Sequence, residues 1–430
     1  MTAKEALDAA RLRGGKDGLN CIAELVDSLP TQTDAALPLA GMPVLVKDNI
    51  DVRGLHTTAG SLALADNLAE HDAPIIRNLR RNGAVILGKT NMTEFANFTT
   101  AGMPAGYSSR GGQVIHAANP ARDPCGSSTG SAVAVSAGIV PAAVGTDTSF
   151  SIILCALENG VCGIKPKVGA LSSEGIIPIS RTLDSAGALG KTFTDALSLY
   201  SAMRGTPLPA LTPASPGELR IAVNIVNRDM FPADRQAYIA RVLAALRKRG
   251  VSMGEVCGHP TGFLRVIMQW EFQPHLEDYL RTASASRKTL REIVDCYTAH
   301  PDTMMKYGIS FLKSALNETP GGLAGAPYLA AMEARRLAIE KTSAEISAYD
   351  AVIVAGPTNI MHFCGFPSAT VVGAETDEDG VPRGVMLYST DELRLYRAAL
   401  AIEQILQHPE DCAGQLYQQA QLPRTHRLAE

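Results

Sequence analysis

The sequence predicts an α/β fold, because apolar strand segments and amphipathic helical segments alternate along the chain. Residues 72–83 have the pattern of a helix, and residues 84–88 follow as a strand. Residues 218–226 and 232–250 repeat this pairing in the order strand, then helix. The chain has 430 residues, of which 46% are hydrophobic, and no Pro/Ser-rich linker or repeat divides it. We therefore expect one large domain over residues 1–430.

The first helical segment has recognisable ends, with Asp72 near its start and Gly83 just past its end. Residues 261–348 are mainly helical in pattern, and strands return at 351–356 and 367–373. Within this domain we expect the helical insert at about 261–348 to cover the substrate cleft.

Two blocks rich in Gly, Ser and Thr flank an apolar segment in the first half of the chain. The blocks are GSSTGS at 126–131 and GTDTSFS at 145–151, and the apolar residues 132–144 join them. This arrangement predicts two loops dense in backbone groups, connected by a buried helix and a buried strand. A nucleophile and its oxyanion hole are commonly built from such loops.

These blocks belong to a longer series of motifs that resembles the amidase signature family, serine amidohydrolases with a Ser, cis-Ser, Lys triad. The resemblance is strong in GMPVLVKDNI, LGKTNMTEFA, GSSTGSAVAVSAG, GTDTSFS, NGVCGIKP and GIIPISRTLDSAG, and weaker in AGPTN and GFPSATVV. It implies a mixed central sheet covered by helices on both faces. It also implies that Lys47 is the lysine, Ser127 the bridging serine after a cis peptide bond from Gly126, and Ser151 the nucleophile.

The chemistry of these three residues is consistent on physical grounds. Apolar neighbours of Lys47 disfavour its charged form and lower its pKa, so its amine can act as a general base. The Ser127 hydroxyl can accept a proton from one side while donating one to the other. Ser151 can then attack a carbonyl carbon and form an acyl-enzyme, and Ser127 returns the proton to the leaving amine.

The predicted oxyanion hole consists of backbone N–H groups in the nucleophile loop, those of Thr148, Ser149, Phe150 and Ser151. Here the chain departs from the family. Ser149 and Phe150 stand where glycines are usual, and Ile153 and Cys155 replace an arginine and a proline. If the loop needs a positive φ at position 149 or 150, a non-glycine residue is strained there.

Other residues are candidates for the substrate pocket, although each also has a structural interpretation. Ser128 can serve as the N-cap of the helix that follows it, and Asp147 can hold its loop by local hydrogen bonds. His362 suits a pocket wall or a satisfied core position better than a catalytic base. The pocket candidates are Ser128, Cys125, Phe150, Trp270 and His362.

A second enzyme class matches part of the pattern, because Gly126, Ser128 and Gly130 spell GxSxG, the nucleophile elbow of α/β-hydrolases. That elbow requires an apolar strand directly before it. The preceding residues HAANPARDPC do not form such a strand, and no histidine has an adjacent acidic or metal-ligand pattern beyond what chance gives. The sequence therefore favours the Ser–Ser–Lys interpretation.

Composition and charge limit the classes of protein to which the chain can belong. The net charge is −4 and Lys and Arg are scattered, so we expect no nucleic-acid partner. No run reaches the roughly 20 apolar residues that span a bilayer, and the polar start is unlike a signal peptide, so we expect a cytoplasmic protein without a membrane partner. The eight cysteines have no CxxC spacing, which favours neither zinc nor a disulfide framework. We expect no cofactor and no metal.

The expected reaction is hydrolysis of a carboxamide or related C–N bond. Likeness of GYSSRGGQV and GIIPIS to the peptide-amidase-like branch favours a small acylamide or a C-terminally amidated peptide as substrate. Alternatives are the amide-handling subunit of a glutamyl-tRNA amidotransferase-type complex, an amide-forming acyltransferase, or a relative with low activity. The sequence leaves a homodimer open and does not identify the acyl group or the amine.

Overall fold

The structure is a computed structural model and describes residues 1–30 and 34–408. Its strands are β1 Ile22–Leu25, β2 Pro43–Lys47, β3 Val85–Thr90, β4 Tyr107–Ser108, β5 Gly112–Gln113, β6 Ala142–Asp147, β7 Cys162–Lys165, β8 Ser185–Gly190, β9 Arg220–Asn224, β10 Ser252–Val256, β11 Ala351–Val354, β12 Ser368–Thr376 and β13 Pro382–Tyr388. Its helices are α1 Ala3–Arg13, α2 Pro74–Arg81, α3 Thr129–Ser136, α4 Ile153–Glu158, α5 Phe193–Met203, α6 Ala233–Lys248, α7 Leu264–Thr282, α8 Leu290–Ala299, α9 Pro301–Met304, α10 Ser310–Asn317, α11 Ala326–Ile346, α12 Ile360–Phe363 and α13 Glu392–Leu406.

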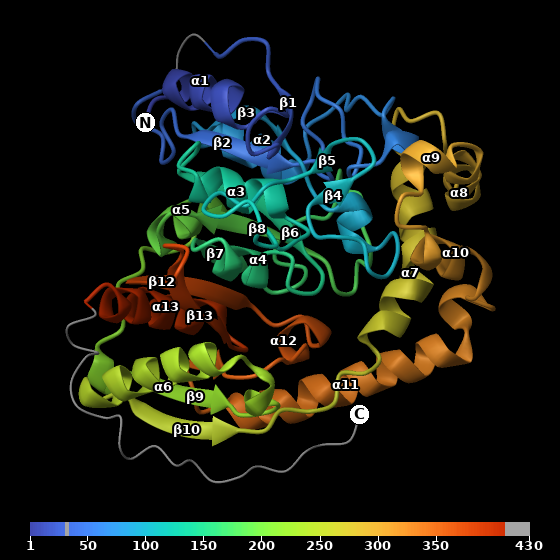
Figure 1. Cartoon of the computed structure of the whole chain (residues 1–430). Helices are drawn as coiled ribbons and strands as arrows, with labels where there is room; N and C mark the ends of the chain where they lie inside the picture. Colours follow the sequence, from blue (N-terminus) through green and yellow to red (C-terminus); the bar gives the residue numbers. More distant parts are fainter. Residues whose placement is uncertain (31–33, 409–430) are drawn as a thin grey trace.

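One mixed sheet runs through the described molecule. Its 11 strands lie in the order β1-β3-β2-β6-β8-β7-β12-β13-β11-β9-β10, from the top to the bottom of Figure 1. β2 is parallel to both β3 and β6, whereas β8 is antiparallel to its neighbours β6 and β7. β4 and β5 form a separate hairpin. The predicted α/β class and mixed sheet are confirmed.

Alternate residues of the central strands enter two different hydrophobic cores. On β2, Val44 and Val46 pack into one core and Leu45 into the other, as the two-residue period of a strand requires. The first core takes its helical residues mainly from α2, α5, α6 and α13, and the second from α1, α3, α4, α11 and α12. Helices thus cover both faces of the sheet.

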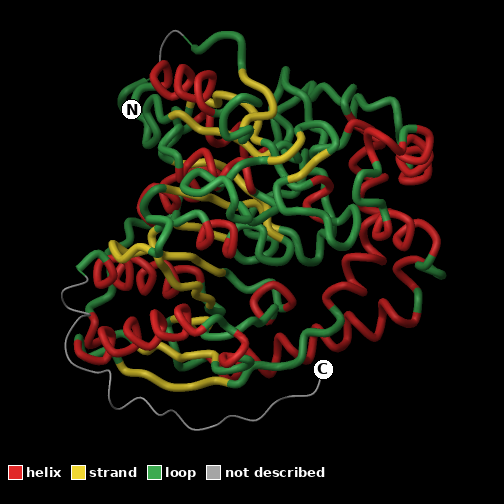
Figure 2. Tube along the Cα trace, viewed as in Figure 1, coloured by secondary structure: helices red, strands yellow, loops and turns green. Residues whose placement is uncertain are grey.

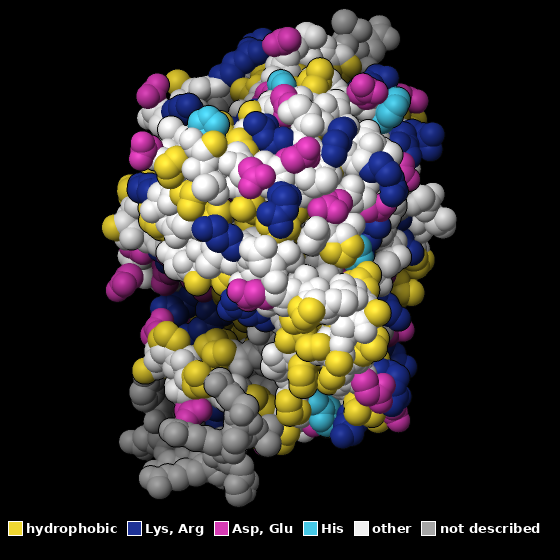
Figure 3. Space-filling model, turned by 90° about the vertical axis from the view of Figure 1, so that its right-hand side faces the viewer, with side chains coloured by type: hydrophobic (Ala, Val, Ile, Leu, Met, Phe, Trp, Pro, Cys, Tyr) yellow, Lys and Arg dark blue, Asp and Glu magenta, His cyan; other side chains and the backbone are white. Residues whose placement is uncertain are grey.

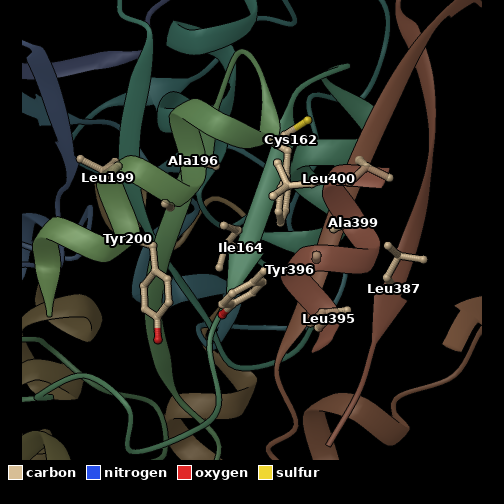
Figure 4. Close-up of a cluster of buried hydrophobic side chains, with 14 of the residues drawn as sticks. Cys162, Ile164, Ala196, Leu199, Tyr200, Leu387, Leu395, Tyr396, Ala399 and Leu400 are labelled. Atoms are coloured by element: carbon tan, nitrogen blue, oxygen red, sulfur yellow. The ribbon is translucent and has the colours of Figure 1, made fainter. Parts of the chain in front are cut away.

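In the first core, α5 packs against β7, α13 packs against the neighbouring β12, and the two helices contact each other. Figure 4 shows Tyr200 of α5 and Tyr396 of α13 on the same side of β7, below Ile164. The two tyrosine rings are 5.7 Å apart at an angle of 71°, which is an edge-to-face geometry that aromatic pairs favour. This packing supports β7 and β8, and β8 pairs directly with β6.

Residues 261–348 contain the helices α7 to α11, which lie at the right of Figure 1. A third hydrophobic core joins α7, α8 and α10 to loop residues of the first half of the chain, including Phe95 and Phe98. Basic and acidic side chains alternate over the upper part of this side of the molecule in Figure 3. Its function as a cover over a substrate cleft remains a prediction.

The remaining sequence-predicted elements also occur. The segment 72–83 contains α2, residues 84–88 begin β3, and the two serine blocks are joined by α3 and β6. Between β3 and α3 the chain runs mainly as loop, visible in green in Figure 2. Among the helices of residues 1–30 and 34–408, none is long and apolar enough to cross a membrane.

Candidate active site

The three residues predicted to act together form a continuous chain of short contacts. Lys47 Nζ lies 2.7 Å from Ser127 Oγ, and Ser127 Oγ lies 3.1 Å from Ser151 Oγ. Lys47 and Ser127 have no exposed surface, whereas Ser151 is 6% exposed. A proton can therefore pass from Ser151 through Ser127 to Lys47, while only the outermost hydroxyl is reachable from solvent.

Strand pairing explains why residues so distant in sequence meet here. β2 and β6 are parallel neighbours, with Val46 opposite Val144, so both strands end at the same edge of the sheet. Lys47 is the last residue of β2, and the loop with Ser151 follows the end of β6. Ser127 immediately precedes the N-cap of α3, which packs on β6. The edge of the sheet thus gathers all three residues.

The environment of Lys47 suits a base. Its ammonium group is buried, and desolvation lowers the pKa from 10.5 to about 7, against the opposing effect of nearby carboxyls such as Asp147. Besides Ser127, its Nζ lies within 3.1 Å of Ser128 Oγ, Thr146 O and Thr146 Oγ1. A neutral amine has two N–H donors and one lone pair, so Thr146 and Ser128 can take the donors and leave the lone pair for the Ser127 hydroxyl.

The bond between Gly126 and Ser127 is cis, as the resemblance implied. Glycine is required at 126 by close packing, because a Cβ there would lie 2.3 Å from Thr93 Oγ1. Cys125, just before it, has a positive φ of 56° and is half-buried. This packing and the turn at Cys125 bring Ser127 to the start of α3.

The nucleophile loop is held by side chains on several elements. Asp147 Oδ2 accepts the N–H groups of Ile152 and Ile153 at 2.7 and 3.2 Å, which confirms its predicted structural role. Thr148 Oγ1 donates to Asp184 at 2.6 Å. Ser149 Oγ donates to Asn359 Oδ1 at 2.9 Å. The loop is therefore anchored at almost every position around Ser151.

Phe150 adopts a φ of +70°, the left-handed conformation that favours glycine. Its ring packs edge-on against His362, with centroids 4.4 Å apart. Its backbone N–H donates to His362 Nε2 at 3.2 Å. Among the described residues, the N–H groups of Thr148, Ser149 and Ser151 have no protein acceptor, so three of the four predicted oxyanion donors are free to bind a ligand oxygen.

Of the five pocket candidates, the structure buries three and leaves two partly accessible. Ser128 is at the N-cap of α3, but its hydroxyl bonds to Thr146 O and Lys47 instead of capping the helix. His362 has no exposed surface, so it lies behind the nucleophile loop and not on a pocket wall. Trp270 is only 8% exposed and packs into the second core. Cys125 and Phe150 remain partly accessible next to Ser127 and Ser151.

Sequence reasoning missed several supporting residues, namely Thr146, Asp184, Asn359 and Asn49. The side-chain amide of Asn49 donates to Thr146 Oγ1 at 3.1 Å. Thr146 could have been found from its place in the nucleophile block. The contacts of Asp184 and Asn359 join segments that are far apart in sequence, so no local pattern indicates them. Within residues 1–30 and 34–408, no group of three or more His, Cys, Asp or Glu side chains could hold a metal ion.

Comparisons with known proteins identify related sequences. A family model described as Amidase matches residues 19–364. An indoleacetamide hydrolase of Pseudomonas savastanoi is 37% identical over 247 residues, covering 55% of this chain and 52% of that protein. A glutamyl-tRNA(Gln) amidotransferase subunit from Deinococcus deserti is 31% identical over 337 residues, covering 74% of this chain and 68% of that protein.

The fold has a close solved counterpart. The peptide amidase of Stenotrophomonas maltophilia superposes with a TM-score of 0.84 at 30% identity, covering 94% of this chain and 93% of that chain. A probable amidase of Arabidopsis thaliana is 44% identical over 168 residues, but the aligned part spans only 33% of that protein. The chain thus spans about a third to a half of the length of some curated relatives that it matches. Because the family model matches most of its length, the chain belongs to the amidase family.

Proposed function

We propose that this chain is an amidohydrolase that cleaves a carboxamide C–N bond through an acyl-enzyme on Ser151. The observation that supports this most directly is the chain of contacts from Lys47 Nζ to Ser127 Oγ at 2.7 Å and on to Ser151 Oγ at 3.1 Å. In this scheme neutral Lys47 is the general base, Ser127 the proton relay and Ser151 the nucleophile.

The steps follow from these positions. Ser151 Oγ forms a bond to the substrate carbonyl carbon, and its proton moves to Ser127 as the Ser127 proton moves to Lys47. The negative oxygen of the tetrahedral intermediate binds free backbone N–H groups of residues 148–151. The C–N bond then breaks, and the proton returns through Ser127 to the amine nitrogen. A water molecule then attacks the acyl carbon while its proton passes to the relay, and the carboxylic acid leaves as Ser151 regains its proton.

A small acylamide or a C-terminally amidated peptide is the substrate class that we propose. The support is the overall likeness to the peptide amidase of Stenotrophomonas maltophilia. The ring of Phe150 packs against His362 and the second core, but the side chain is only half-buried beside Ser151, so its exposed part leaves less room near the nucleophile than a glycine would. We expect short acyl groups to be preferred.

The test is steady-state hydrolysis of a panel of primary amides, amidated peptides and the corresponding esters, with Ser151→Ala as the control. We expect ammonia release from at least one amide and none from the variant. Glutamine hydrolysis that appears only with a partner protein would instead favour a role within an amidotransferase complex, for which the Deinococcus deserti relative gives sequence support. Equal turnover by Ser151→Ala would contradict the proposal.

A further inference from the structure

A buried pair outside the proposed proton relay connects the nucleophile loop to α12. His362 of α12 and Asp147 at the end of β6 both have no exposed surface. The His362 Nδ1 atom lies 3.2 Å from Asp147 Oδ1. The other ring nitrogen, Nε2, lies 3.2 Å from the backbone nitrogen of Phe150, which donates to it.

These contacts define the protonation state of the imidazole. A nitrogen that accepts an N–H must present its lone pair, so Nε2 carries no proton. The ring proton then belongs on Nδ1, where it faces the Asp147 carboxylate. Burial alone would raise the pKa of Asp147, but His362, Lys165 and the Ile152 N–H together outweigh burial and lower it to about 2. Asp147 is therefore a carboxylate, and the Phe150 N–H fixes which nitrogen of the neighbouring imidazole accepts.

The pair binds the backbone on both sides of Ser151. His362 holds the N–H of the residue before Ser151, and Asp147 Oδ2 holds the N–H groups of Ile152 and Ile153 just after it. Phe150 must stay at its φ of +70° for Ser151 to point at Ser127, and that conformation is unfavourable for a non-glycine residue. The imidazole supplies the bond and the ring contact that stabilise it.

We propose that His362 is a positioning residue that keeps the Ser151 hydroxyl aligned with Ser127 by holding the backbone of Phe150. This inference rests on the proposed function, in which Ser151 is the nucleophile. His362 touches neither Ser151 Oγ nor the relay in the described contacts, so its effect is transmitted through the loop. It differs from a core histidine in that its loss lowers the reactivity of Ser151 more than it lowers stability.

Several charged and titratable groups surround the pair. Asp147, on β6, lies beside His362. Lys165 of β7 and Lys47 of β2 lie within electrostatic range of Asp147, and Cys155 lies nearby on α4. Position 153 is an isoleucine, so the first turn of α4 brings no cation to Asp147.

Two substitutions separate the two contacts. In His362→Gln, the side-chain oxygen reaches the place of Nε2 and can still accept the Phe150 N–H. In His362→Asn, the amide reaches only the place of Nδ1, so it keeps a contact to Asp147 and leaves the Phe150 N–H without its acceptor. His116→Gln is the matched control, because His116 is also buried but bonds Glu158 O, away from the site.

The readout is the rate at which a fluorophosphonate labels Ser151, followed by intact mass, since this needs no knowledge of the natural substrate. Ser151 Oγ forms the P–O bond, fluoride leaves, and the proton passes through Ser127 to Lys47. We expect labelling of His362→Asn to be about 100-fold slower than wild type, the order of loss for a displacement of about 1 Å. We expect His362→Gln and His116→Gln to label within about threefold of wild type at neutral pH.

The outcomes distinguish this inference from the proposed function. A wild-type protein that is not labelled on Ser151 contradicts the proposed function itself. A labelled wild type with His362→Asn reacting equally fast, or with His362→Gln as slow as His362→Asn, overturns the positioning role. If His362→Asn does not fold, His362→Gln remains the test, and a tenfold loss of its labelling rate at an unchanged melting temperature overturns the inference.

Discussion

Burial of a single amine sets the pH range in which the serines can react. Desolvation lowers the pKa of Lys47 to about 7, and only the neutral amine can take the proton from Ser127. Below this pKa the amine is protonated and cannot act as a base; above it the amine is neutral. We therefore expect kcat/KM to rise with pH through about 7 on its acid limb. A rate that is constant from about pH 5 to 9 in a protein that stays folded would contradict this assignment.

The relay also predicts non-additive losses. Lys47→Ala and Ser127→Ala should each lower kcat by about 10²- to 10⁴-fold, the usual contribution of general acid–base catalysis. The double variant should be scarcely slower than either single variant, because residues that act as one unit lose their effect together. Single-turnover acylation measures all three. A double variant whose loss equals the product of the two single losses would show that the residues act independently.

Phe150 is the residue whose substitution should change specificity. Replacing Ser149 and Phe150 by glycine removes the ring beside Ser151 and relieves the positive φ of +70°. We expect kcat/KM for bulky acyl amides to rise relative to short ones, while Ser151 remains reactive. Phe150→Ala is the control, because it removes the ring but keeps a Cβ at positive φ. An unchanged ratio in both variants would place acyl selection elsewhere.

Among single residues, the sequence predicted the three side chains that the structure brings together, but not the residues that support them. Lys47, Ser127 and Ser151 were identified because the resemblance assigns one role to each motif. A positive φ was foreseen only as a condition on position 149 or 150, and the structure places it at Phe150. His362 was expected either on the pocket wall or in the core, since no local pattern shows that α12 folds behind the loop. Long-range contacts of this kind depend on the strand order.

Among the helices, α7 is tied to the active-site side of the molecule by one buried carboxylate. Glu271 is 1% exposed and accepts the hydroxyls of Ser180 and Tyr328, each at 2.6 Å. It also accepts the N–H and hydroxyl of Thr182. The same loop continues to Asp184, which holds Thr148 of the nucleophile loop. Glu271 thus links α7 and α11 to the site.

Glu271→Ala should lower the free energy of unfolding by about 3 kcal/mol, because several buried donors lose their acceptor at once. Glu271→Gln should lose less, since its oxygen can still accept two of them. Glu333→Ala on α11 is the matched control, because its side chain is 58% exposed in a surface ion pair and should change stability by about 0.5 kcal/mol or less. Chemical denaturation compares them. A Glu271→Ala protein as stable as Glu333→Ala would contradict the link.

The elements themselves were largely predictable, and for physical reasons. Segments with a clear helical or strand period, such as α2, α6 and β3, were expected near their observed bounds. The two-residue hairpin strands and the short 3₁₀ turn Glu94–Asn97 between β3 and α3 were not, because they are too short to show a period. The order of strands across the sheet was also beyond local patterns, since β2 pairs with both β3 and β6.

For the whole molecule, the position of a strand in the sheet should decide how strongly its amides are protected. β6 and β8 are paired on both sides and lie between the two cores, whereas β1 and β10 are the edge strands. Buried, doubly paired strands open only with the largest free energies. We expect hydrogen exchange by mass spectrometry to be slowest in β6 and β8 and fastest in β1 and β10. Equal exchange in β10 and β6 would contradict the observed sheet order.

The central claim is that Ser151 carries the acyl group. The most direct measurement is the intact mass of the protein after rapid quenching with an activated ester or amide, followed by peptide mapping of the modified residue. We predict an adduct of one acyl group on Ser151 that is absent from Ser151→Ala and strongly reduced in Lys47→Ala. An adduct that persists in Ser151→Ala on another serine, above all Ser128, would contradict the account.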